Sequence, residues 1–162
     1  MPIQIGQSLP DVEIAVVDGA AEIKRIPSSE LFAGRNVVLF GVPGAFTPTC
    51  SERHLPGYVK HYQTFKARGM DVYGMSVNDA FVMKAWGASQ HVPEGLKLLA
   101  DGNASLTKAL GLEMDGSAYG MGIRSRRFAL HAENGIVKWI GVESPGELRV
   151  SGAEAVLQQL LS

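Results

Sequence analysis

Residues 37–54 read VVLFGVPGAFTPTCSERH, an apolar run followed by a loop of glycine and proline residues and then by polar residues. A short apolar run rich in valine and bounded by turn residues is typical of a buried β-strand. The sequence Thr49-Cys50-Ser51-Glu52 matches a capping box, in which Thr49 would cap a helix and Glu52 would bond back to the Thr49 N–H. The segment therefore predicts a strand, a loop and a helix, with Cys50 in the first helical turn.

The rest of the chain alternates short apolar runs with longer segments of helical spacing, which indicates the α/β class with a mixed central sheet flanked by helices. Strands are predicted at Val12–Val17, Ala21–Ile26, Val37–Val42, Asp71–Val77, Leu96–Ala100, Arg127–Ala132 and Ile136–Val142. Helices are predicted at Ser29–Phe32, from about Cys50 to Ala67, and at Asp79–Ser89, Ala104–Leu110 and Ala153–Leu161. With 162 residues and no linker or internal repeat, we expect a single domain over residues 1–162.

Turn and capping residues set the limits of these elements. The pair Asn134-Gly135 lies between alternating apolar residues and predicts an antiparallel hairpin. Asn78 or Asp79 is expected to cap the helix that follows it, and Gly69 to end the helix that begins after Thr49. The glycine-rich segment 116–122 is expected to be a flexible loop.

The composition fits a soluble protein and argues against two classes of partner. Hydrophobic residues make up 46% and charged residues 19% of the chain, with no apolar window long enough to span a membrane. The net charge is −1, and only Arg124, Arg126 and Arg127 are clustered, so we expect no nucleic-acid surface. The first residues, MPIQIG, lack the basic start and apolar core of a secretory signal, so a cytoplasmic location is expected.

Cys50 is the only cysteine of the chain, which excludes an intrachain disulfide. The histidines at 54, 61, 91 and 131 show no zinc-site spacing, and no bound metal or cofactor is expected. The free N–H groups and partial positive charge of a helix start favour the thiolate of a cysteine over its thiol. A lone cysteine is often a small buried apolar residue instead. The polar residues on both sides of Cys50 favour a reactive thiol.

At this point the residues resemble a known family. Pro43-x-x-x-Thr47-x-x-Cys50 is similar to the peroxidatic motif of the peroxiredoxins, and the longer string PGAFTPTCS followed by HLPG resembles their type II, or peroxiredoxin-5, branch. The segment SVNDAFVMKAW at 76–86 and the triplet RRF at 126–128 also fit that branch. The resemblance extends from Ile5 to the final helix.

The resemblance implies a thioredoxin-like fold and a thiol peroxidase. In this reading Cys50 attacks a hydroperoxide, becomes a sulfenic acid and releases water or an alcohol. The Thr47 hydroxyl and the Cys50 backbone N–H would bind the peroxide, and Arg127 would donate to the sulfur and the peroxide oxygens. Pro43 would shield the sulfur from water.

Each of these roles has an alternative in the sequence. Thr47 could be only a turn hydroxyl, and Pro43 could only shape the loop. Arg126 competes with Arg127, because neighbouring residues of a strand point to opposite faces. His54, about one turn after Cys50, could tune the pocket or lie on the helix surface. The histidines at 61, 91 and 131 are interpreted as surface or structural residues.

Some members of the branch resolve the sulfenic acid with a second cysteine, but the corresponding segments, 73–75 and 149–152, contain none. An external thiol is therefore expected as the reductant, with glutathione and glutaredoxin favoured over thioredoxin. The branch also implies a homodimer. Two other functions use the same thiol: a cysteine hydrolase with a histidine base, and a redox sensor that passes its oxidation to a partner protein.

Overall fold

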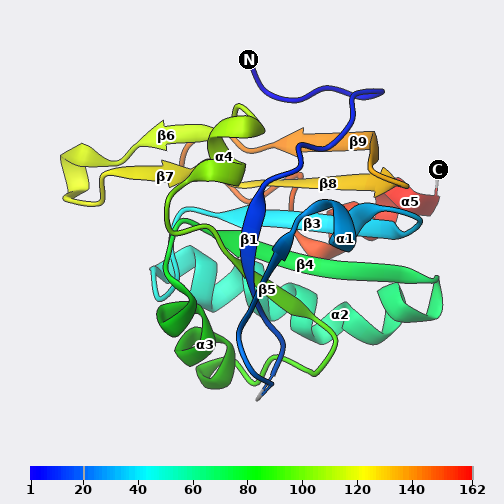
Figure 1. The fold of residues 1–162 in the computed structure, drawn as a ribbon, viewed down its shortest axis with the longest axis horizontal. Helices are drawn as coiled ribbons and strands as arrows, with labels where there is room; N and C mark the ends of the chain where they lie inside the picture. The colour runs from blue at the N-terminus through cyan, green and yellow to red at the C-terminus, as the bar shows by residue number, and fades with distance from the viewer. Residues whose placement is uncertain (20, 162) are drawn as a thin grey trace.

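The computed structural model describes residues 1–19 and 21–161, and they form a mixed sheet covered on both faces (Figure 1). The main sheet has the strand order β2-β1-β5-β4-β3-β8-β9. Its strands are β1 (Glu13–Val17), β2 (Lys24–Pro27), β3 (Asn36–Val42), β4 (Met70–Ser76), β5 (Lys97–Ala100), β8 (Phe128–Glu133) and β9 (Ile136–Val142). A separate two-stranded sheet consists of β6 (Glu113–Asp115) and β7 (Ile123–Ser125). The helices are α1 (Ser29–Phe32), α2 (Leu55–Ala67), α3 (Ala80–Ser89), α4 (Ser105–Ala109) and α5 (Ala153–Leu161), with a π-helical turn, η1 (Cys50–His54), and a 3-10 turn, η2 (Ser117–Tyr119).

The sheet is mixed, as predicted. Strands β3, β4 and β5 are parallel, whereas β8 is antiparallel to β3 and β9 is antiparallel to β8. Figure 1 shows β4, β3 and β8 side by side in the middle of the molecule. Because β8 runs opposite to β3, the start of β8 lies beside the end of β3, with Gly41 opposite Phe128.

Strand β3 forms part of two apolar clusters, one on each face of the sheet. Val38, Phe40 and Val42 belong to the cluster that contains buried residues of α2, α3 and α5. Val37 and Leu39 belong to the cluster that contains buried residues of α1 and α4. This alternation follows from the two-residue period of a strand, and it explains why the run has no polar residue.

Most predicted elements are confirmed, with ends shifted by a few residues. Asn134 and Gly135 have φ values of +49° and +76°, as a tight hairpin turn requires. Asp79 caps α3 by accepting from the Val82 N–H at 2.8 Å, and Gly69 follows α2 with φ +74°. The strand pair β6–β7 and the turn η2 lie in and around the segment predicted as a loop, because three-residue strands carry too little pattern to identify.

The predicted capping box at Thr49 is wrong. Thr49 has helical backbone angles and its side chain makes no capping bond. The helical conformation begins at Pro48, and the Ser51 N–H donates to the Thr47 carbonyl at 3.0 Å. Proline is favoured at the first position of a helix because it has no N–H to leave unpaired, which moves the start ahead of Thr49. Cys50 still lies in the first turn, as predicted.

Among the described residues, no helix combines the length and the hydropathy needed to cross a bilayer.

Candidate active site

The residues around Cys50 come from several strand ends at one edge of the sheet. The loop 43–49 follows β3, Asn78 follows β4, Arg127 precedes β8 and Glu143 follows β9. The register places these strand ends together, since Val42 lies opposite Ser76 and Phe128 lies opposite both Gly41 and Val142. Residues far apart in the sequence therefore share one site.

Cys50 is a free cysteine with 0% exposure, and it packs in the apolar cluster beneath α2. The polar environment predicted for it is therefore only partly correct. Cys50, His54 and Tyr58 are spaced by four residues, so they share the helix face that packs on the sheet. The side chains of Glu52 and Arg53 point to solvent instead.

Arg127 is the arginine that reaches the sulfur. Its Nη2 donates to Cys50 Sγ at 3.2 Å, and its Nη1 lies 3.0 Å from His54 Nδ1. The alternative placement of Arg126 at the sulfur is wrong. Arg127 also lines a cavity of about 420 Å³, together with Pro43, Tyr119 and Arg126.

His54 is buried, so the prediction that it could lie on the helix surface is wrong. Its Nε2 lies 3.0 Å from the Ser151 carbonyl oxygen. Burial, together with the nearby Arg127 charge, lowers the pKa of His54 to about 3, although the hydrogen bond to Ser151 and the Glu143 charge oppose this. Both nitrogens of this neutral imidazole are thus occupied, so His54 is not placed to act as a base for Cys50, which argues against the cysteine hydrolase.

The loop between β3 and the helix is fixed by hydrogen bonds. The Thr47 hydroxyl donates to the Gly44 carbonyl at 2.6 Å, as its reading as a turn residue predicted. The Ala45 N–H donates to Asn78 Oδ1 at 3.0 Å, and Arg124 Nη1 donates to the Pro43 carbonyl at 3.4 Å. Pro43 and Thr47 are half-buried. Asn78, considered in the sequence only as a helix cap, instead holds this loop.

Two further contacts hold the start of the helix, and neither was predicted from the sequence. Trp86 Nε1 donates to the Ser51 hydroxyl at 2.9 Å, and the Tyr58 hydroxyl donates to the Ser151 carbonyl at 2.6 Å. Burial, reinforced by the Glu143 charge, raises the pKa of Tyr58 well above its usual value, so it remains a donor. Trp86 lies within the segment 76–86 that carried the resemblance, whereas Ser151 gave no signal.

Glu143 was also missed. Burial alone would raise the pKa of Glu143, but hydrogen bonds from the Ser151 hydroxyl and from the N–H groups of Arg149, Ser151 and Val150 outweigh it and hold the pKa below its usual value. The carboxylate is therefore ionised although it is only 5% exposed.

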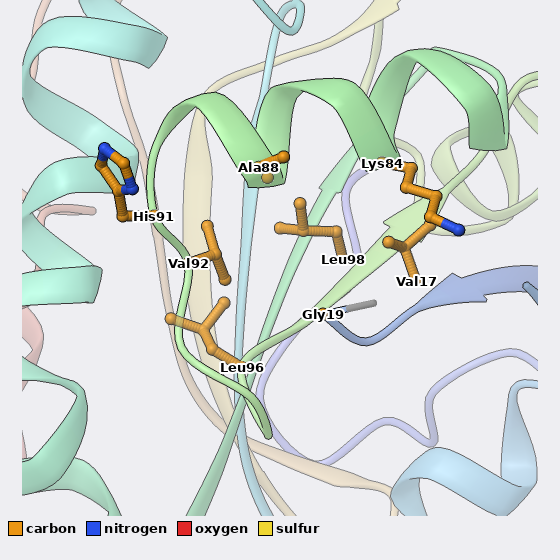
Figure 2. Close-up of a pocket in the computed structure, with 9 residues that line it drawn as sticks. Val17, Gly19, Lys84, Ala88, His91, Val92, Leu96 and Leu98 are labelled. Atoms are coloured by element: carbon orange, nitrogen blue, oxygen red, sulfur yellow. The ribbon is translucent and has the colours of Figure 1, made fainter. Parts of the chain in front are cut away.

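Figure 2 shows a different cavity, of about 360 Å³, between α3 and the strands β1 and β5. Its wall includes Val17, Val92, Leu96 and Leu98, with Lys84 and His91 at its ends. None of the predicted site residues lines it. Within residues 1–19 and 21–161, no group of three or more His, Cys, Asp or Glu side chains is arranged to hold a metal ion.

Comparison with known proteins agrees with this geometry. Residues 4–157 match the Redoxin family model. The chain is 49% identical over 160 residues to Peroxiredoxin-2C of Oryza sativa subsp. japonica, covering 98% of this chain and 99% of that protein. The crystal structure of reduced Prx3 with hydrogen peroxide from Vibrio vulnificus has a TM-score of 0.90 and 51% identity, over 98% of this chain and 96% of that one. The 1-Cys peroxiredoxin of Plasmodium falciparum has a TM-score of 0.90 and 30% identity, over 98% and 99% of the two chains.

These matches confirm the thioredoxin-like fold and the resemblance found in the sequence. The chain belongs to the Redoxin family and is a one-cysteine peroxiredoxin of the type II, peroxiredoxin-5-like branch, an oxidoreductase that reduces peroxides with thiols.

Proposed function

We propose that Cys50 is the peroxidatic nucleophile of this enzyme. The observation that carries the proposal is the hydrogen bond of 3.2 Å from Arg127 Nη2 to Sγ, at the start of a helix. The guanidinium and the helix N-terminus both stabilise negative charge on sulfur. The thiolate attacks one peroxide oxygen, the O–O bond breaks, and the leaving oxygen takes a proton as water or alcohol while Cys50 becomes a sulfenic acid.

The surrounding groups bind the peroxide. The Thr47 hydroxyl donates its proton to Gly44, so its lone pairs remain free to accept the O–H of a hydroperoxide. The Cys50 N–H belongs to the first helical turn, which has no intrahelical partner for it, and it can donate to the second peroxide oxygen. Arg127 stabilises the charge that moves from sulfur to oxygen. Pro43 lines the same cavity as Arg127 and would limit the entry of water to the sulfur.

The sulfenic acid is reduced by an external thiol. This thiol displaces water to give a mixed disulfide, and a second thiol then attacks the first thiol's sulfur, forms a disulfide with it and releases Cys50 as a thiol. Ser151 stands in one of the segments where other members carry a second cysteine, and Cys50 has no partner in its own chain. We favour glutathione with glutaredoxin over thioredoxin.

The decisive experiment compares the wild type with Cys50→Ser. In the presence of a thiol, the wild type should consume hydrogen peroxide and alkyl hydroperoxides, and the variant should not. Peroxide without reductant should add oxygen to Cys50 alone, seen as stepwise mass increases. Equal turnover by Cys50→Ser would refute the proposal, and a single oxidation that only a partner protein reverses would favour the redox sensor.

We further propose a homodimer that works in the cytoplasm as a single folded domain. Phe46, Phe81 and Tyr119 are 56%, 80% and 84% exposed, and exposed aromatic side chains are typical of contact surfaces. A chain with one cysteine also suits a reducing compartment. We expect sedimentation to show a dimer and cell fractionation to find the protein in the cytoplasm. The chain should unfold in a single cooperative transition. A monomer at working concentration would refute the dimer.

A further inference from the structure

The carboxylate of Glu143 lies inside the loop that joins β9 to α5. Its oxygens accept from the backbone N–H groups of Arg149, Val150 and Ser151 at 2.7 to 2.9 Å, and from the Ser151 hydroxyl at 2.7 Å. Successive N–H groups that converge on one anion form a strong and well-defined site. The loop is therefore folded around one buried negative charge.

This loop presents the carbonyl of Ser151 to the catalytic helix. The carbonyl oxygen contacts His54 Nε2 at 3.0 Å and accepts from the Tyr58 hydroxyl at 2.6 Å. A carbonyl can only accept, so the single proton of the neutral His54 ring lies on Nε2. Arg127 can only donate, so Nδ1 must face it as an acceptor, 3.0 Å from Nη1. The carbonyl therefore favours the tautomer in which an unprotonated Nδ1 faces the arginine.

We propose that Glu143 is a positioning residue for peroxide reduction: it fixes the Ser151 carbonyl, which sets the His54 tautomer and thereby the direction in which Arg127 meets Cys50. The inference rests on the proposed roles of Cys50 and Arg127. Without the carboxylate, the loop N–H groups would lose their acceptor and the loop would rearrange. A proton on Nδ1 would then point an N–H at the N–H of Arg127 and push the guanidinium away from the sulfur.

The backbone of Glu143 makes a contact of its own, so the role of the side chain can be tested separately. The backbone N–H of Glu143 donates to the Arg127 carbonyl at 2.9 Å, and a substitution of the side chain leaves this bond in place. The same loop also supplies a matched control, because the Glu147 carboxylate pairs at the surface with the exposed guanidinium of Arg149, at 3.6 Å.

The test uses Glu143→Gln in the full chain, with Glu147→Gln as the control. Glutamine keeps the shape of the side chain but removes its negative charge, and with its oxygen in the position of Oε2 its NH₂ would face the N–H of Arg149. Two quantities are measured: the His54 tautomer by ¹⁵N NMR, and the rate of Cys50 oxidation by hydrogen peroxide in a single turnover without reductant. For Glu143→Gln we expect a population of the Nδ1–H tautomer and an oxidation rate roughly 10-fold to 100-fold lower, the cost of a misplaced catalytic group. Glu147→Gln should match the wild type in both.

The outcomes separate positioning from loss of structure. An unchanged rate in a folded Glu143→Gln overturns the proposal, and so does a lower rate with an unchanged tautomer, which loop damage alone would give. If Glu143→Gln does not fold, Ser151→Ala removes one donor to the carboxylate but keeps the carbonyl. It should show a smaller change of tautomer and rate in the same direction, and wild-type values for both would overturn the proposal. Failure of the proposed function would appear elsewhere, as a wild type that does not oxidise at Cys50.

Discussion

The guanidinium of Arg127 makes two contacts at once through two nitrogens of one rigid plane. One nitrogen donates to Cys50 Sγ and the other faces His54 Nδ1. The planar fork holds both directions in one rigid group, whereas a lysine offers one compact charge on a flexible stem. Because position 127 must make both contacts, a positive charge alone is not enough there.

Arg127→Lys is therefore expected to impair the reaction although it keeps the charge. The rate of Cys50 oxidation by peroxide should fall by about 10²-fold to 10³-fold, as for the loss of one donor to a developing charge. Stopped-flow measurement of a single turnover gives this rate directly. Arg126→Lys is the matched control and should stay near the wild type, and a wild-type rate for Arg127→Lys would mean that the positive charge alone suffices without the fork.

At the scale of the elements, the sequence identified what local pattern determines and missed what tertiary contacts determine. The run from Val37 to Val42 is apolar throughout and was placed within one residue of β3. The start of the helix that contains Cys50 was misplaced because Pro48 competes with the capping signal at Thr49. The π-helical turn has no sequence signature, and such turns are often found at functional sites. Glu143 could not be found because its partners become neighbours only when the loop closes around it.

The π-helical turn is held from α3 through Trp86. The indole N–H donates to the Ser51 hydroxyl, next to Cys50, at 2.9 Å. Trp86→Phe removes this bond and also part of a buried ring, so the free energy of unfolding should fall by about 1 kcal/mol for the bond and further for the cavity that is left. A double-mutant cycle with Ser51→Ala, measured by urea unfolding, should give a coupling energy of about 1 kcal/mol for the bond. Additive effects of the two substitutions would show that the bond does not stabilise the turn.

At the scale of the whole molecule, strand order explains how separate segments build one site. Strands β3 and β4 are parallel, so both end at the same edge of the sheet. Because β8 is antiparallel to β3 and β9 is antiparallel to β8, β8 begins and β9 ends at that edge too. Open α/β sheets commonly bind ligands beyond the carboxyl ends of their strands, where neighbouring loops diverge. The resemblance predicted that Arg127 donates to the Cys50 sulfur, and the structure shows this contact, but only the register shows why residues 77 positions apart meet.

Burial of the neutral His54 couples the site to the stability of the whole fold. The pKa of His54 is lowered from 6.5 to about 3, chiefly by burial. Between these values the unfolded chain binds a proton that the folded protein does not, so stability is complete above the unfolded pKa and is lost as pH falls toward the folded one. From pH 7 to pH 5 the contribution of His54 should decrease by about 2 kcal/mol. Urea unfolding at pH 7 and at pH 5 measures this decrease in stability. His54→Asn is the comparison, because His131, whose pKa is also lowered, affects both proteins equally. An equal loss of stability between pH 7 and pH 5 in the two proteins would show that His54 becomes protonated within the folded state.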